Sequence, residues 1–132
     1  MSTILVNTLT CTITSVSIAV TGEGNSTTTN LQQGLCKAYA HFTGGFSVAD
    51  SFNVASLTDN GTGRPEFNFT NNMGNSTYSG AGHSYNRAVG ANATDGNFTS
   101  SSAAMSLFST GGSLDDVGGS QIAGVNYFGD LA

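Results

Sequence analysis

The stretch that decides the fold is SLTDNGTGRPEFNFT, residues 56–70. Within it, Asn60-Gly61 predicts a two-residue type I′ turn, because that turn needs a positive φ at both central residues and these two tolerate it. Asp59 is placed to accept a backbone hydrogen bond in an Asx-turn, and Thr62-Gly63 allows a longer loop or a bulge beside the turn. We therefore assign the turn of a β-hairpin to Asp59, Asn60 and Gly61.

The residues on both sides of this turn read as strands. Phe67 and Phe69 share one face of the strand that follows, which is the pattern of a half-buried strand. The preceding residues 52–58 are extended but do not alternate strictly, so we expect a bulge near Ala55-Ser56. Pro65 cannot donate to a ladder and should stand at a strand start or on an edge. The stretch is thus interpreted as a hairpin, and Asp59 alone does not make a calcium loop.

Short apolar runs separated by turn residues recur along the rest of the chain. In residues 35–42, Cys36, Ala38, Ala40 and Phe42 lie on one face, opposite a face with Tyr39 and His41. Residues 31–40 are the best helix candidate, but Gly34 interrupts them. Strands about ten residues apart with little helix predict an all-β fold, a β-sandwich or a jelly-roll-like small barrel. Further strands are expected in residues 46–48, 78–89, 97–109 and 122–128.

The composition excludes some classes of function. Charged residues make up 8% of the 132 residues, while Ser, Thr, Asn and Gly supply 65 of them. The net charge is −5, and the three basic residues are Lys37, Arg64 and Arg87. A phosphate backbone needs a basic footprint, so direct nucleic-acid binding is not expected, and neither is binding to an anionic membrane. A surface built from hydroxyls and amides suits a protein covered by copies of itself or by a large partner.

No pattern indicates catalysis, a cofactor or a metal. The histidines His41 and His83 show no HxH or HxxxH spacing, so a metal site would rest on their availability alone. There is no GxSxG elbow and no phosphate-binding loop. Asp115-Asp116, flanked by glycines, reads as a solvated loop tip. We expect no catalytic residue, no cofactor and no metal, and six Asn-x-Ser/Thr triplets are attributed to composition.

The first thirty residues differ from the rest in being rich in Thr and nearly free of charge and aromatic rings. We expect residues 1–30 to form a strand or arm that packs on partner subunits, and residues 31–132 to form one β-sandwich domain. The start lacks the pattern of a signal peptide or a transmembrane helix, so a cytosolic origin is expected. Cys11 and Cys36 are either bridged or two small buried side chains. Candidate contacts with partners, equally readable as core strands, are Ile4, Leu5, Val6, Val16, Ile18 and Val20.

The segment from Leu35, LCKAYAHFTGGFSVADSFNVASLTDNGTGRPEFNFTNNM, resembles one found in virion structural proteins of tailed phages, especially marine ones. The opening MSTILVNTL and the closing YFGDLA are similar to the first and last segments of the same proteins. The specific part is SLTDNGTG followed by NFT. Arg64-Pro65 departs from the pattern, since the family usually has Asp and an aromatic residue there.

The resemblance implies a small β-rich component of a phage particle that assembles as a homo-oligomer, a trimer, and contacts the major capsid protein or other virion proteins. Two readings stay open. A capsid decoration (cement) protein would lie on the outside of the shell and stabilise it. A tail-fibre or receptor-binding module would contact the host, with Tyr39, Tyr78, Tyr85 and Tyr127 exposed for carbohydrate. No enzyme activity is expected in either case.

Overall fold

The computed structural model describes residues 18–21, 28–85, 88–91, 98–109, 111–118 and 122–132. These residues form ten strands and one short helix. In chain order the elements are β1 (Ala19–Thr21), β2 (Thr28–Asn30), α1 (Leu31–Gly34), β3 (Cys36–Thr43), β4 (Ser47–Phe52), β5 (Val54–Asp59), β6 (Pro65–Phe69), β7 (Ser79–Ser84), β8 (Ala88–Ala91), β9 (Ser102–Phe108) and β10 (Ile122–Phe128).

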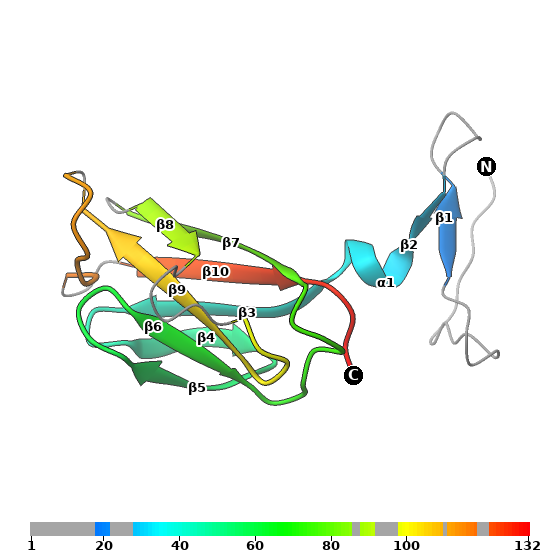
Figure 1. Ribbon diagram of the computed structural model, residues 1–132, viewed down its shortest axis with the longest axis horizontal. Coiled ribbons are helices and arrows are strands. Elements are labelled where there is room, and N and C mark those ends of the chain that lie inside the picture. Colours follow the sequence, from blue (N-terminus) through cyan, green and yellow to red (C-terminus); the bar gives the residue numbers. More distant parts are fainter. Residues whose placement is uncertain (1–17, 22–27, 86–87, 92–97, 110, 119–121) are drawn as a thin grey trace.

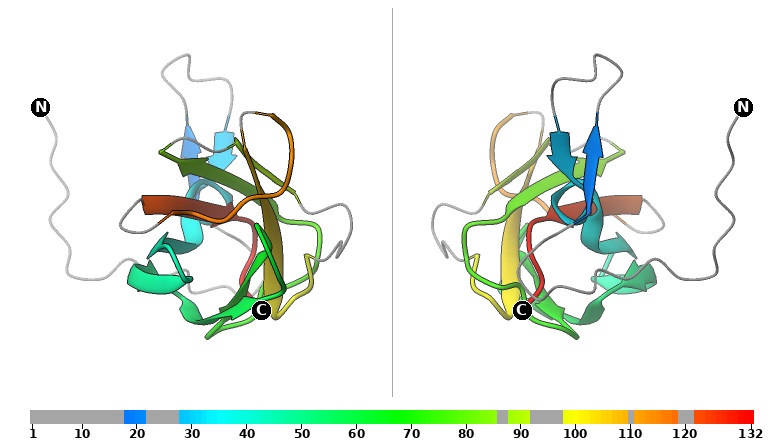
Figure 2. Two further views of the ribbon diagram at one scale, coloured as in Figure 1. Left: turned by 90° about the vertical axis from the view of Figure 1, so that its left-hand side faces the viewer. Right: turned by 90° about the vertical axis from the view of Figure 1, so that its right-hand side faces the viewer.

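Eight of these strands make two antiparallel sheets of four, in the orders β4-β3-β10-β7 and β5-β6-β9-β8. The sheets face one another as the two layers of a β-sandwich (Figures 1 and 2). The prediction of an all-β sandwich is confirmed, whereas the jelly-roll arrangement is not. The chain joins neighbouring strands in pairs, β3 with β4, β5 with β6, and β8 with β9, and changes sheet between the pairs.

Asn53 is the single residue between β4 and β5, where the chain passes from one sheet to the other. Its φ of 56° lies in the left-handed region, which Asn adopts more readily than most residues. The Asn53 side chain donates to the carbonyl oxygens of Lys37 and Asn71, both at 3.0 Å, and accepts from the Asn71 backbone N–H at 2.7 Å. One amide side chain thereby fixes this corner of the sandwich.

The predicted hairpin is the pair β5–β6. Pro65 is the first residue of β6, and the register shifts between Val54 and Ser56, so the expected strand start and bulge are confirmed. The Gly61 N–H donates to Asp59 Oδ1 at 2.8 Å, which is the expected Asx-turn.

The prediction of a type I′ turn at Asn60-Gly61 was wrong. Asn60 does not have the positive φ that such a turn requires, while Gly61 and Gly63 do, at 108° and 67°. The tight turn runs from Gly61 to Arg64, closed by the Arg64 N–H on the Gly61 carbonyl oxygen at 2.9 Å. The second glycine takes the left-handed position, and the loop lengthens to residues 60–64.

The core between the sheets is an aromatic cluster. Phe67 and Tyr127 have no exposed surface, and Phe69, Tyr78 and Phe98 pack around Tyr127 with ring centres 5.5 to 6.0 Å from it. The predicted inward face of β3 is confirmed, since Ala38, Ala40 and Phe42 are buried. Aromatic rings at these separations and tilts contribute about 0.5–1.5 kcal/mol per pair beyond the area they bury.

Two tyrosines of this cluster differ in what their hydroxyls meet. The Tyr78 hydroxyl donates to the carbonyl oxygens of Ser102 and Thr99, at 2.8 and 2.9 Å. The buried Tyr127 hydroxyl has no hydrogen-bond partner in the part of the chain that the structure describes. Burial raises the pKa of both hydroxyls, so both stay neutral.

Replacing each of these tyrosines by phenylalanine should therefore change stability in opposite directions. Tyr127→Phe removes an unsatisfied buried hydroxyl and should raise the free energy of unfolding by about 1 kcal/mol. Tyr78→Phe removes the hydroxyl donor of the Thr99 carbonyl and one of the donors of the Ser102 carbonyl, and should lower it by about 1–2 kcal/mol. Urea denaturation of the two variants in parallel measures both values. Equal losses in the two variants would show that the Tyr127 hydroxyl is satisfied in solution.

Two other expectations are corrected. The helix candidate 31–40 is helical only over α1, because Gly34 ends it and the residues from Cys36 pair with β10 and β4. Asp116 is not part of a free loop tip, since its Oδ1 accepts the Gly63 N–H at 2.6 Å. Next to it, the Asp115 N–H donates to the Leu107 carbonyl oxygen at 3.0 Å. Asp116 thus ties the connection after β9 to the β5–β6 turn, and Asp115 ties it to β9 itself.

Among the strands that the structure describes, β1 and β2 pair with each other alone, as a two-stranded sheet, and α1 joins them to the sandwich. In Figure 1 this hairpin extends beyond one end of the sandwich, the end at which the C-terminus also lies.

Among the candidate contacts, Ile18 is half-buried and its carbonyl oxygen accepts the Leu31 N–H at 2.8 Å, while Val20 lies in β1 opposite Thr29. Ile4, Leu5, Val6 and Val16 lie outside the described residues, as does Cys11. Cys36 has a free thiol.

Candidate functional site

The side chains best suited to bind a ligand lie on the solvent-facing side of the sheet β4-β3-β10-β7, which we call the outer face. It is defined here by two rows of residues that are directly opposed across all four strands. The first row is Phe52, Tyr39, Asn126 and Ala81, and the second is Asp50, His41, Gly124 and His83. Opposed residues of antiparallel strands share a face and stand close enough to interact.

In the first row, the Tyr39 ring is stacked on Phe52, with ring centres 6.2 Å apart. The Tyr39 hydroxyl donates to Asp50 Oδ2 at 3.2 Å. This bond, together with the negative charge of the Asp50 carboxylate, raises the pKa of Tyr39, which keeps the phenol neutral. Phe52 is 52% exposed, so the row presents an apolar ring to solvent beside a carboxylate.

In the second row, two imidazoles meet above a glycine. The His41 and His83 rings have centres 5.7 Å apart and planes at 87°. Both side chains are exposed, while Gly124 beneath them is buried. A Cβ atom at position 124 would lie 2.5 Å from His83 Cε1 and 2.7 Å from His41 Cδ2, so the rings can close over this position only because it is glycine.

Sequence reasoning missed this pairing. His41 and His83 are 42 positions apart in the sequence, and they meet only because β3 and β7 flank β10. A spacing motif detects ligands on one strand or one helix, so it cannot detect two histidines that lie on different strands. The one available signal was the alternation that placed His41 on the solvent-facing side of its strand.

The expected set of four exposed tyrosines is corrected. Tyr78 and Tyr127 are 8% and 0% exposed and belong to the core, because each occupies an inward position between the two sheets. Tyr85 is highly exposed in the connection after β7, and Tyr39 is half-buried on the outer face. A carbohydrate surface built from all four rings does not exist.

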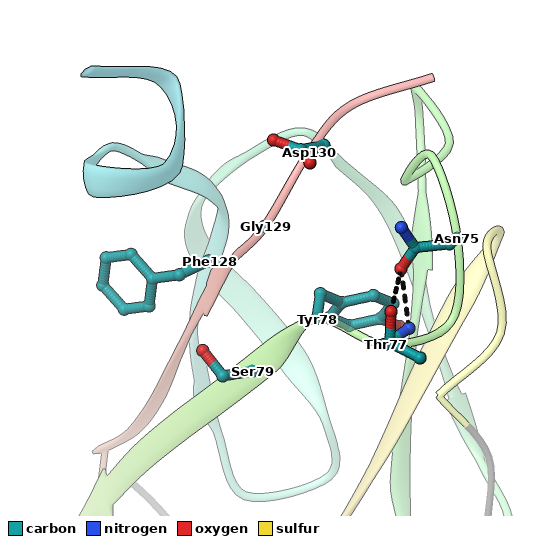
Figure 3. A pocket seen from close by; sticks show the side chains of 7 residues that line it. All are labelled: Asn75, Thr77, Tyr78, Ser79, Phe128, Gly129 and Asp130. Carbon is teal, nitrogen blue, oxygen red and sulfur yellow. Dashed lines mark hydrogen bonds between the residues drawn. The ribbon is translucent and has the colours of Figure 1, made fainter. Parts of the chain in front are cut away.

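A pocket of about 350 Å³ opens near the C-terminus, where β7 begins and β10 ends (Figure 3). Its lining residues are Asn75, Thr77, Tyr78, Ser79, Phe128, Gly129 and Asp130. Asn75 Oδ1 accepts from both the N–H and the hydroxyl of Thr77, at 2.7 and 2.6 Å, so these polar groups are satisfied within the loop. Asp130 is the one acidic group in the lining, which gives the pocket no acid–base pair.

Comparison of the chain with protein-family models, with curated proteins and with solved structures found no match. Among the residues that the structure describes, no helix is long and apolar enough to cross a membrane. Within the same residues, no group of three or more His, Cys, Asp or Glu side chains is close enough to hold a metal ion together.

Proposed function

We propose that this chain is a non-enzymatic structural protein of a phage particle, a capsid decoration protein that binds the outside of the shell as a homotrimer and stabilises it. It is made in the host cytoplasm and contacts the major capsid protein. The proposal starts from the resemblance of residues 35–70 to virion proteins. The structural observation that supports it is the β1–β2 hairpin, which pairs with no strand of the sandwich.

An isolated two-stranded hairpin is marginally stable in water, so this element needs a surface to pack on. Two exposed apolar side chains lie at the same end of the sandwich. Leu35 is 51% exposed between α1 and β3, and Phe128 is 37% exposed at the end of β10, paired with Cys36. Leu35 and Phe128 give this end of the sandwich exposed apolar surface for contact with a neighbouring subunit or with the shell.

Particles lacking the protein provide the test. Purified protein added to such particles should bind with icosahedral symmetry over the whole shell when imaged by electron microscopy. The double variant Leu35→Ser with Phe128→Ser should bind at least about tenfold more weakly, because two apolar contacts are lost. Val48→Ser is the matched control, since Val48 is 40% exposed, between the values of Phe128 and Leu35, but lies near the β3–β4 turn at the other end.

Density confined to the tail, or equal loss of binding in the Val48→Ser control, would contradict this proposal. A protein that stays monomeric at every concentration in solution and on the particle would contradict the trimer.

The second candidate is a tail-fibre or receptor-binding module. The observation that favours it is the outer face, where the exposed Phe52 ring, Tyr39 and the two histidines stand beside the Asp50 carboxylate. Flat rings next to polar groups are suited to the apolar and hydroxylated sides of a sugar. Soluble protein that binds host cells and blocks infection would support this candidate and would overturn decoration of the capsid.

A further inference from the structure

We propose that His41 and His83 chelate one divalent transition-metal ion of the Cu²⁺, Ni²⁺ or Zn²⁺ class above Gly124. The inference rests on the geometry of the second row of the outer face and is independent of where the protein acts. Neither histidine contributes to the core or to the β5–β6 hairpin, so the fold itself does not require the pair.

Both rings lie over the position of Gly124. A Cβ atom at position 124 would lie 2.9 Å from His83 Nε2 and 2.7 Å from His41 Cδ2, the carbon bonded to His41 Nε2. An imidazole nitrogen binds zinc at about 2.0–2.1 Å, which puts each ring centre about 3 Å from the ion. Two such rings stand up to about 6 Å apart, and the observed separation of their centres is 5.7 Å. Small rotations of two exposed side chains therefore bring both nitrogens onto one ion.

The donor set selects the kind of metal. Imidazole suits Zn²⁺, Cu²⁺ and Ni²⁺, whereas Ca²⁺ and Mg²⁺ require oxygen ligands. Asp50 stands opposite His41, and its Oδ2 accepts the Tyr39 hydroxyl. Because the described residues hold no group of three possible ligands, the site offers the two imidazole nitrogens. Water completes the coordination of an ion held by two imidazoles, and affinity should follow the order Cu²⁺ > Ni²⁺ and Cu²⁺ > Zn²⁺.

Gly124 is the residue that permits the site. A side chain at this position would push the imidazoles apart, yet the atoms it would meet are the ends of exposed, movable rings. Gly124→Ala should therefore leave the sandwich folded while separating the two ligands. This gives a way to disrupt the site with both histidines still present.

The test is a calorimetric titration of the full-length, untagged protein with CuCl₂, NiCl₂ and ZnCl₂. We expect one ion per chain, and an affinity at least about tenfold weaker in His41→Gln, in His83→Gln and in Gly124→Ala. Phe52→Leu, in the neighbouring row, is the matched control and should bind as the wild type does, because it leaves the Tyr39–Asp50 hydrogen bond in place. Circular dichroism checks that each variant is folded.

A second measurement needs no variant. Paramagnetic Cu²⁺ added in small amounts should broaden the ring resonances of His41 and His83 together, before other resonances, in the NMR spectrum of the wild-type protein. Unchanged affinity after substitution of either histidine, equal weakening by Phe52→Leu, or broadening of one ring alone would overturn the proposal.

Discussion

Gly63→Ala is expected to lower the free energy of unfolding by about 3–5 kcal/mol, a large part of the 5–15 kcal/mol that stabilises a typical domain. The φ of Gly63 is 67°, which costs an alanine about 1–2 kcal/mol. An added Cβ would also lie 2.7 Å from the Leu107 carbonyl oxygen and 2.8 Å from the Asp115 nitrogen, both of them backbone atoms. Relieving these contacts requires the backbone itself to move.

Further hydrogen bonds are at risk in the same variant. The Leu107 N–H donates to the Gly63 carbonyl oxygen at 2.8 Å, and the Gly63 N–H donates to Asp116 Oδ1 at 2.6 Å. A shift at residue 63 therefore disturbs β9 and the connection that follows it. Equilibrium denaturation in urea measures the loss.

Gly61→Ala is the matched control, in the same loop. Gly61 also has a positive φ, of 108°, but a Cβ atom there would meet nothing within 4 Å. This φ lies outside the left-handed region that other residues can adopt, so we expect a loss of about 1–3 kcal/mol from backbone strain alone. Similar losses in the two variants would show that the contacts around Gly63 relax freely. The contacts of residue 63 with Leu107 and Asp115 would then not contribute to the free energy of unfolding.

The second large effect is expected for Asn53→Ala, with a loss of about 2–4 kcal/mol. Alanine is strained at a φ of 56°, and the variant removes the side-chain bonds to Lys37 and Asn71, each worth about 1 kcal/mol. Because Asn53 is the single residue between β4 and β5, the loss falls on the corner that joins the two sheets.

Asn53→Gly separates the two causes, since glycine accepts the positive φ but makes no side-chain bond. Its loss should be smaller than that of Asn53→Ala by about 1 kcal/mol, the share due to strain. Chemical denaturation of both variants gives the difference. If both lose less than about 0.5 kcal/mol, the hydrogen bonds of this corner contribute nothing net to stability.

The sequence was sufficient for the fold class and for the hairpin, because both depend on local patterns. Phe67 and Phe69 alternate with polar residues, Pro65 starts β6, which is one of the two places expected for it, and the irregular spacing around Ala55 matches the bulge. The choice between Gly61 and Gly63 was beyond local reasoning. What makes Gly63 indispensable is the backbone of Leu107 and Asp115, more than forty positions away.

The candidate site was missed for the same reason. Tyr127 and Phe128 are adjacent aromatic residues, and only the pairing of β10 with β3 and β7 decides which of them is buried. His41 and His83 become neighbours through that same strand. The sequence around Asp116 predicts a solvated side chain, whereas in the fold Asp116 accepts a hydrogen bond from the Gly63 N–H of the β5–β6 turn. Each of these contacts is between residues far apart in the chain, and composition and periodicity carry no information about them.

The place of β10 in the sheet has a consequence for how the protein is made. Ile122–Phe128 is the last strand of the sandwich to leave the ribosome, yet it lies between β3 and β7 and pairs with both. Until it emerges, β7 has no partner in its sheet, and β3 pairs only with β4. The sandwich must therefore close after synthesis of residue 128, through contacts such as Ile122 with Thr43 that span most of the domain. Such non-local closure is slow, so a nascent chain stalled before β10 should remain open to proteases and to other unpaired strands.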